Sequence, residues 1–329
     1  MNTTAYEARV RQQIEQYRDV ENMHALPDIF HYWSNKYLRP KINVVLEVDS
    51  INDFYAEHLF RAAKRQEGRC RFASLGAGDC WLEIEISRLL KAKGLADFRI
   101  DCLELSPVLL ARAETAARAA GVSDFLNLVP TDLNAWSPES QCYTGIIANH
   151  SLHHMVELEK IFDGTKDALR PDGIFVTNDM IGRNGHMRWP EALAWVEQIW
   201  GFLPDRLKYN RQVDLLDEKF VNRDCSVDGF EGIRAQDILP LLTSQFHFTH
   251  FLGDGGLIDL FVDRGYGHNF NPNDVKDVAL IDFIQALNGL LLEQGVIKPT
   301  IMFAVMTPSV GELTKCHGML TPQFAMRAT

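Results

Sequence analysis

Short apolar runs alternate with amphipathic segments through the middle of this chain, from about residue 69 to residue 180. The apolar runs predict five strands, at 72–75, 98–105, 126–130, 143–148 and 174–178. The amphipathic segments predict helices between them, at 82–91, 107–120 and 158–169. Apolar strands joined by helices are typical of a parallel sheet with right-handed crossovers. We therefore expect an α/β fold with a mostly parallel sheet.

Residues 1–68 show a different, helical pattern. Apolar side chains recur at helical spacing within 5–18, and Ser50 with Asp53 predicts the capped start of a helix over 50–64. Between them lies an unusually aromatic segment, 27–40, in which Pro40 is expected to end a helix. We expect residues 1–68 to form an N-terminal helical cap.

The rhythm breaks again after residue 182. Residues 183–234 contain an aromatic helix, 191–202, and a charged stretch, which predicts an insertion that forms a lid over the acceptor. Further elements complete the core sheet over 235–310: helices at 235–244 and 274–292, and strands at 246–252 and 300–307. Residues 311–329 are expected to be a tail.

Composition excludes several classes of partner. The formal net charge of −11 repels nucleic-acid backbones and anionic lipid, so we expect neither nucleic acid nor membrane as a partner. The six cysteines are scattered, and the first 21 residues lack the apolar core of a signal peptide. These features favour a cytoplasmic protein. A homodimer is allowed by the sequence.

The strand at 72–75 leads into a glycine turn, Gly76-Ala77-Gly78-Asp79. Glycine lets a backbone approach a ligand closely, although a lone pair of glycines is a weak signal. The third glycine of a dinucleotide fingerprint is replaced by Trp81. That replacement disfavours a pyrophosphate and favours a cofactor without phosphate.

Polar residues follow the next three strands at their carboxyl ends. Glu104 and Leu105 end the strand at 98–105, and a carboxylate there can accept both ribose hydroxyls. Asp132 and Leu133 follow the strand at 126–130 and suit an adenine, although Asp132 alone would be an ordinary helix cap. The run from Asn149 to His154 follows the strand at 143–148. All of these positions fall on one rim of the expected sheet.

On these motifs the chain resembles the S-adenosylmethionine-dependent methyltransferases with the Rossmann-like seven-stranded fold. The resemblance implies that Gly76, Ala77, Gly78, Asp79, Glu104, Leu105, Asp132, Leu133 and Asn149 bind the cofactor. The family's usual acid before the glycines is Ser74 here, and its usual third glycine is Cys80. Asp79 is the expected local substitute for the missing carboxylate.

Methyl transfer needs an aligned acceptor and a group that takes one proton. His154, His186 and His150 are the expected catalytic residues because histidine titrates near neutral pH. Tyr32 and Trp33 are expected to form an aromatic wall beside the sulfonium, with helix packing as the equal alternative. A metal site built from some of His150, His154, Asp179, His186 and His268 is a minor alternative, and we expect no metal.

The sequence thus predicts methyl transfer from S-adenosyl-L-methionine to a small-molecule acceptor, at oxygen or nitrogen, in secondary or glycan metabolism. Two alternatives stay open at this point. One is an NAD-dependent oxidoreductase, and the other is a non-catalytic, nucleoside-binding relative of the same fold. The acceptor itself cannot be read from the sequence.

Overall fold

A computed structural model describes residues 6, 9–10, 25–227, 229–311 and 314–327. Most of the helix expected over 5–18 lies outside these residues. The described chain builds one large sheet with the strand order β10-β8-β9-β5-β4-β1-β2-β3. Its strands are β1 (Cys70–Leu75), β2 (Phe98–Glu104), β3 (Leu126–Pro130), β4 (Tyr143–Asn149), β5 (Leu169–Met180), β8 (His247–Asp254), β9 (Ile301–Thr307) and β10 (Lys315–Cys316).

Five strands of this sheet are mutually parallel, as the sequence predicts. β1 pairs in parallel with both β2 and β4, and the pairing continues to β3 on one side and to β5 on the other. β9 is antiparallel to β5 and to β8, which confirms an antiparallel closing pair. The described sheet has eight strands, so the expected count of seven is not confirmed.

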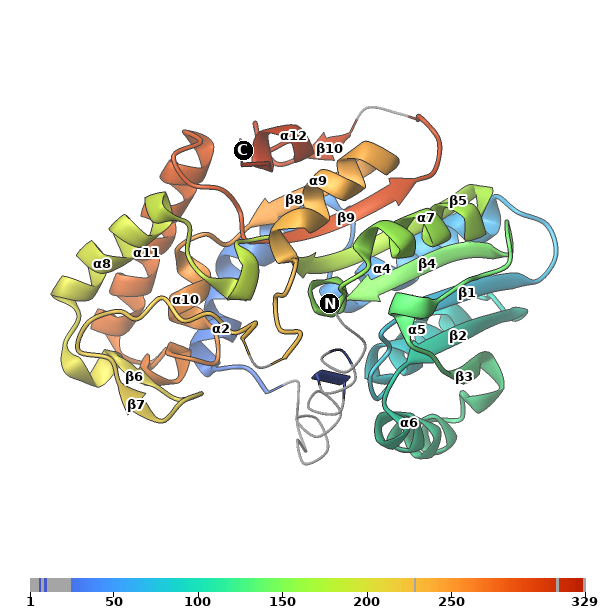
Figure 1. Ribbon diagram of the computed structural model, residues 1–329, viewed down its shortest axis with the longest axis horizontal. Coiled ribbons are helices and arrows are strands. Elements are labelled where there is room, and N and C mark those ends of the chain that lie inside the picture. Colours follow the sequence, from blue (N-terminus) through green and yellow to red (C-terminus); the bar gives the residue numbers. More distant parts are fainter. Residues whose placement is uncertain (1–5, 7–8, 11–24, 228, 312–313, 328–329) are drawn as a thin grey trace.

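Helices cover both faces of the sheet (Figure 1). One face carries α4 (Ile51–Lys64), α5 (Trp81–Ala92) and α6 (Pro107–Ala120), and the other carries α7 (Leu158–Ala168) and α9 (Ala235–Gln245). Neighbouring strand residues alternate between the two cores: Phe303 and Val305 belong to the first, and Met302 and Ala304 to the second. This period of two lets one strand bury both of its faces.

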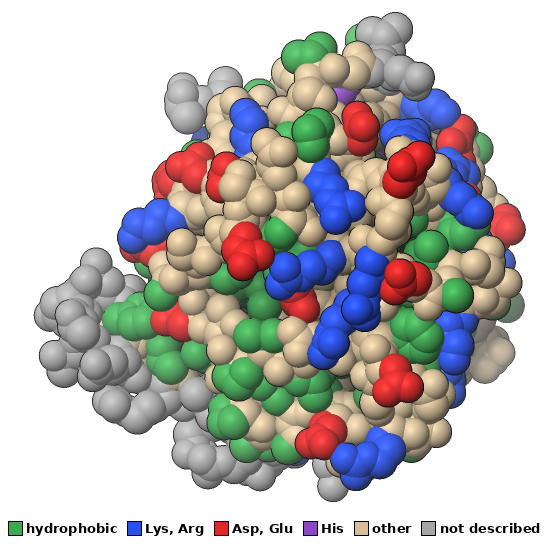
Figure 2. Space-filling model, turned by 90° about the vertical axis from the view of Figure 1, so that its right-hand side faces the viewer, with side chains coloured by type: hydrophobic (Ala, Val, Ile, Leu, Met, Phe, Trp, Pro, Cys, Tyr) green, Lys and Arg blue, Asp and Glu red, His purple; other side chains and the backbone are tan. Residues whose placement is uncertain are grey.

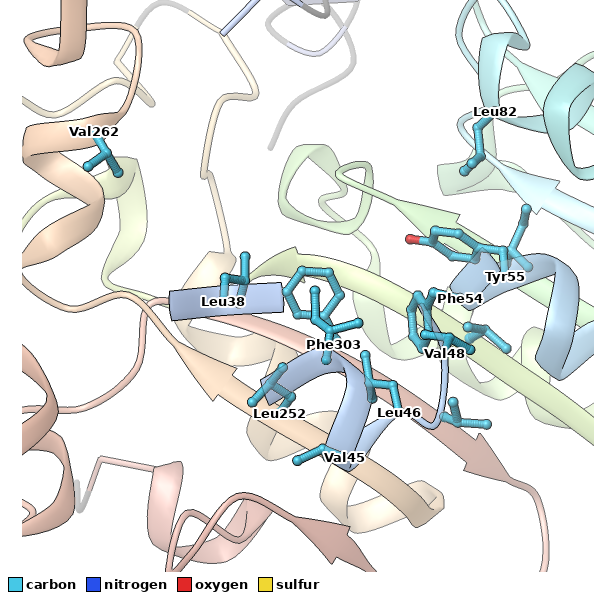
Figure 3. Close-up of a cluster of buried hydrophobic side chains, with 14 of the residues drawn as sticks. Leu38, Val45, Leu46, Val48, Phe54, Tyr55, Leu82, Leu252, Val262 and Phe303 are labelled. Carbon is cyan, nitrogen blue, oxygen red and sulfur yellow. The ribbon is translucent and has the colours of Figure 1, made fainter. Parts of the chain in front are cut away.

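The N-terminal cap divides into two parts. Ser50 caps α4 by accepting the Asp53 N–H at 3.1 Å, as expected, and α4 packs on β4 and β5. Its Phe54 ring lies 5.9 Å from the ring of Phe303, among Leu46 and Val48 (Figure 3). α4 is therefore a layer of the core.

The aromatic segment forms α2 (Asp28–Trp33), a π-helical turn (Ser34–Leu38) and α3 (Arg39–Val45) without a break. The expectation that Pro40 ends a helix is wrong. Arg39 N–H bonds to Ser34 O across the π-turn, and Pro40 then lies in the first turn of α3, where a missing N–H costs little.

A second group of elements, which we call the helical lobe, lies to one side of the sheet in Figure 1. It is built from residues 27–46, 190–216 and 255–300. Besides α2 and α3 it holds α8 (Pro190–Phe202), the hairpin of β6 (Tyr209–Asn210) and β7 (Leu215–Leu216), α10 (Ile258–Val262) and α11 (Val275–Glu293). The predicted helices of the insertion and of 274–292 are thus confirmed as elements, and both belong to this lobe.

The C-terminal segment is not the tail that the sequence predicts. β10 adds to the edge of the sheet in parallel with β8, and α12 (Pro322–Ala325) follows it. Lys298 Nζ donates to the carbonyl of Phe324 at 2.6 Å and lies over its ring, 4.5 Å from the centroid. These contacts fasten the segment to the core.

The amino ends of the parallel strands form the face seen in Figure 2, where Lys and Arg side chains run across the middle with Asp and Glu beside them. Arg69 and Asp97 form an ion pair at 3.3 Å at these strand starts, and Arg71 pairs with Asp101 at 2.9 Å. Among the described helices, none has both the length and the apolar character needed to span a bilayer. The carboxyl ends of the strands, on the opposite side, carry the residues described next.

Candidate functional site

The carboxyl ends of β1 to β5 bring the predicted motifs to one edge of the sheet. The glycine turn follows β1, Glu104 ends β2 and Asp132 follows β3. The Asn149–His154 run follows β4, next to β1 in the strand order. Parallel strands present these ends together, and this edge is where open α/β sheets bind ligands.

Glu104 contacts the glycine turn directly. Its Oε2 accepts the Gly78 N–H at 2.9 Å, and its Oε1 accepts the Ser106 N–H at 2.7 Å. Burial raises the pKa of this carboxyl group, against the effect of these backbone donors. An acid from β2 therefore lies at the turn after β1, the arrangement that a ribose-binding role requires.

Asp132 has internal partners on two sides. It accepts the Asn134 N–H at 3.0 Å and so caps a short 3-10 turn, which is the ordinary role weighed for it. Both of its oxygens also lie 2.8 Å from the Tyr6 hydroxyl. Leu133 beside it is buried. The N-terminal segment thus reaches the same edge of the sheet at Tyr6.

The glycine turn is shaped by the loop after β4. Gly76 has a φ of 72°, and a Cβ there would lie 2.7 Å from the Cβ of Ser151. Ser151 Oγ donates to the Leu75 carbonyl at 2.6 Å and holds the two loops together. Cys80, at the position of the family's third glycine, has a left-handed φ of 58°, a conformation that glycine adopts without strain.

Glu83 of α5 places a carboxylate beside Ser74, where the family's usual acid is missing. Ser74 Oγ donates to Glu83 Oε1 at 2.6 Å, and both side chains are buried. Burial raises the pKa of Glu83 to about 7. Sequence reasoning missed Glu83, although an acid on the apolar face of a helix was the available signal. Asp79, the expected substitute, accepts the Trp81 N–H at 3.2 Å.

Asp179, at the end of β5, anchors the histidine run. Its Oδ2 accepts the backbone N–H groups of Ser151 and Leu152 at 2.9 and 2.8 Å, and its Oδ1 lies 2.6 Å from His153 Nδ1. Burial opposes charge on His153, but Asp179 and Glu231 outweigh it and raise its pKa to about 10. The aspartate thereby fixes the orientation of a buried imidazole.

Glu231 joins three histidines at this edge of the sheet. His186 Nε2 lies 2.7 Å from Glu231 Oε1, His153 Nε2 lies 3.4 Å from the same atom, and His154 Nε2 lies 3.6 Å from Oε2. Burial and the neighbouring His153 lower the pKa of His154 to about 3. Sequence reasoning placed His153 on this edge of the sheet but missed Glu231, because a single acid in the long charged stretch gave no local signal.

His150 and Asn149 lie at the tip of β4 beside this cluster. His150 is exposed at this tip. The protein atoms around its ring partly desolvate it, and this desolvation lowers its pKa. Its Nε2 lies 3.1 Å from Asn178 Nδ2. The Tyr55 hydroxyl donates to Asn149 Oδ1 at 2.9 Å, and Figure 3 shows this hydroxyl pointing away from the apolar cluster.

Tyr32 and Trp33 are not brought to the glycine turn. The Tyr32 hydroxyl donates to Asp282 at 2.8 Å, and the Trp33 indole donates to Gln285 at 2.6 Å, both on α11. Trp33 is fully buried. The aromatic wall expected from them is therefore corrected to its alternative, the packing of α2 within the helical lobe.

Comparisons with known proteins bear on the class of the domain that carries this site. A family model described as a methyltransferase domain matches residues 82–177, from α5 to β5. A search of curated proteins finds no match. The fold is an α/β fold with a mostly parallel central sheet of methyltransferase type. The matched domain supports an S-adenosylmethionine-dependent methyltransferase of Rossmann-like fold with S-adenosyl-L-methionine as cofactor, as predicted, in place of the NAD-dependent and non-catalytic alternatives.

Several solved structures are similar to this chain at low identity. Geranyl diphosphate methyltransferase, in complex with GPP and sinefungin, is 13% identical over 78% of each chain, with a TM-score of 0.44. The [4+2]-cyclase SpnF is 16% identical over 87% of this chain and 100% of its own, with a TM-score of 0.42. A SAM-dependent methyltransferase from Aquifex aeolicus is 9% identical over 66% and 89%, with a TM-score of 0.39.

Proposed function

We propose that this enzyme transfers the methyl group of S-adenosylmethionine to an oxygen or nitrogen atom of a small-molecule acceptor. The observation that carries the cofactor part is the contact between Glu104 and the N–H of Gly78 at 2.9 Å. Each carboxylate oxygen has two lone pairs, so Glu104 can hold the turn and still accept ribose hydroxyls. Asp132 with Leu133 suits the adenine, and Asn149 suits the methionine end.

The acceptor side is supported by the loops that meet over β4 and β5. Gly185 N–H donates to the Gly232 carbonyl at 2.9 Å, and Ile233 N–H donates to the His153 carbonyl at 3.1 Å. These bonds hold residues 185–186 and 231–233 against the strand tips. Loops that cover the strand tips in this way suit a small acceptor, because they help to exclude water from the reacting atoms.

Bound S-adenosylmethionine supplies an electrophilic methyl group on sulfur. As the new bond from the acceptor atom to carbon forms, the carbon–sulfur bond breaks and its electron pair stays on sulfur. The acceptor atom also loses one proton. His186 Nε2 lies 2.7 Å from Glu231, so an imidazole that takes this proton there lies beside a carboxylate that stabilises the positive charge. His154 also faces Glu231, but with its pKa lowered to about 3 it is the weaker base of the two.

Binding of S-adenosylhomocysteine to the Glu104→Gln variant, measured by calorimetry, tests the cofactor role. Glutamine keeps the shape but loses the charge that strengthens hydrogen bonds from two hydroxyls. At about 1.5–3 kcal/mol for a bond to a charged group, affinity should fall by at least about tenfold. Glu139→Gln is the matched control, because Glu139 is largely exposed. Equal affinity in both variants would contradict the assignment.

Transfer of a carbon-13-labelled methyl group into a pool of low-mass metabolites tests the acceptor class. The NMR shift of the labelled methyl distinguishes attachment to oxygen, nitrogen or carbon. Label on oxygen or nitrogen of a small molecule, absent with Glu104→Gln, supports the proposal. Label on carbon, or recovered only in protein or RNA, would overturn it.

A further inference from the structure

His153, His186 and Glu231 present three ligand atoms of the type that transition metals bind. Each residue offers one atom, and all three atoms lie within 4.8 Å of one another. We propose that this cluster binds one divalent transition-metal ion, of the zinc or iron(II) class, on the acceptor side of the methyl-transfer site. The sequence alone favours no metal, because it does not reveal that Glu231 joins the two histidines.

The distances are close to those of a coordination sphere. Metal–ligand bonds of about 2.0–2.2 Å place neighbouring ligand atoms about 3.0–3.5 Å apart. Glu231 Oε1 lies 3.4 Å from His153 Nε2 and 2.7 Å from His186 Nε2. Only small side-chain rotations are needed for the remaining pair, which is already within 4.8 Å.

His153 has the second partner that metal-bound histidines usually have. Its Nδ1 lies 2.6 Å from Asp179 Oδ1, which directs Nε2 toward Glu231. Asp179 is itself fixed by the backbone N–H groups of Ser151 and Leu152. A carboxylate behind the histidine sets its tautomer and strengthens it as a ligand.

The backbone holds the other two ligands in place. His186 has a left-handed φ of 56° and follows Gly185, whose N–H bonds to the Gly232 carbonyl beside Glu231. Cys225 N–H donates to the Gly185 carbonyl at 3.0 Å, which ties the same loop a second time. The ligands are therefore positioned before any ion arrives.

The cluster is partly open, as a site that binds an acceptor must be. The side chains of His186 and Glu231 are 19% and 31% exposed, whereas His153 is 5% exposed. Two imidazoles and one carboxylate leave coordination positions unfilled, a donor set that suits zinc or iron(II) better than magnesium or calcium. His268, from the minor set considered earlier, is exposed in the helical lobe and is not part of the cluster.

This inference deepens the proposed function and rests on it for the position of the acceptor. A metal ion here would restrict acceptors to molecules with a ligating oxygen or nitrogen at or beside the methylated atom. With an ion bound, His186 Nε2 is a ligand and does not take the acceptor's proton. A coordinated hydroxyl group instead loses that proton to solvent at a lower pH, so it becomes a better nucleophile.

Titration of the chelator-treated full-length protein with Co²⁺ alone tests the site. Calorimetry should give one ion per chain, and the visible d–d bands of Co²⁺ report nitrogen and oxygen ligands. Glu231→Gln and His186→Gln should each weaken binding by at least a hundredfold, and Asp179→Asn by about tenfold to a hundredfold. His268→Gln is the matched control and should bind as the parent protein does.

Absence of stoichiometric binding in the parent protein overturns the inference, as does unchanged binding in Glu231→Gln. Circular dichroism establishes that each variant is folded, and His186→Gln serves if Glu231→Gln does not fold. S-adenosylhomocysteine affinity separates the two proposals. A parent protein that binds the nucleoside but no Co²⁺ lacks the metal site alone, whereas loss of nucleoside binding is a failure of the proposed function.

Discussion

Replacing Asp179 by asparagine removes the main support of the loop after β4. The side chain is fully buried, and its two oxygens accept from Ser151, Leu152 and His153 at 2.9, 2.8 and 2.6 Å. The asparagine nitrogen cannot accept a hydrogen bond. Either the two backbone N–H groups at Oδ2 or the His153 ring at Oδ1 therefore loses its acceptor. His153 also loses the charge that it faces.

The expected cost is about 3–5 kcal/mol of unfolding free energy, the range for breaking one member of a buried charged pair. Urea denaturation followed by circular dichroism measures it, with the midpoints compared at equal slope. Asp172→Asn is the matched control, because Asp172 lies on the same strand and is exposed. A loss below about 1 kcal/mol for Asp179→Asn would refute the view that this carboxylate holds the loop.

Three further predictions concern other parts of the chain. Burial lowers the pKa of His58 to about 3, so the contribution of its neutral ring to stability should be complete above pH 6.5 and decline as pH falls toward 3. Urea titrations that show no loss of stability over this interval would contradict this. Gly76→Ala forces a Cβ against Ser151 at 2.7 Å, so calorimetry should show weaker S-adenosylhomocysteine binding; parent-like affinity would count against the tight turn. Ser50→Ala removes the side-chain cap of α4 and should lower the free energy of unfolding, measured in urea, by about 1 kcal/mol. An unchanged free energy of unfolding would contradict the capping role.

The sequence predicts the parallel half of the sheet well, because its apolar runs are short and its helices are amphipathic. The helix at 107–120 and the strand at 126–130 match the structure at both ends. The local sequence pattern was insufficient where contacts between distant parts of the chain determine the secondary structure. Pro40 sits inside a helical run because a π-turn precedes it, and β10 is a strand only because the edge of β8 is available.

The site was predicted in the same uneven way. Glu104 and the glycine turn were found because each follows a strand, and strand ends are visible in a sequence. Glu83 and Glu231 were missed because their partners, Ser74 and the histidines, are distant in the chain or lie on another element. Tyr32 was assigned to the wrong neighbour, since nothing local indicates that it faces Asp282.

The helical lobe is built from three separate stretches of chain, one that precedes the sheet and two that lie between its strands. Trp33, Trp200 and Phe261 from these stretches share one continuous core with Leu252 and Phe303 of the sheet. The lobe therefore cannot be removed, or exchanged as a unit with that of another protein, without disrupting the core that it shares with the sheet.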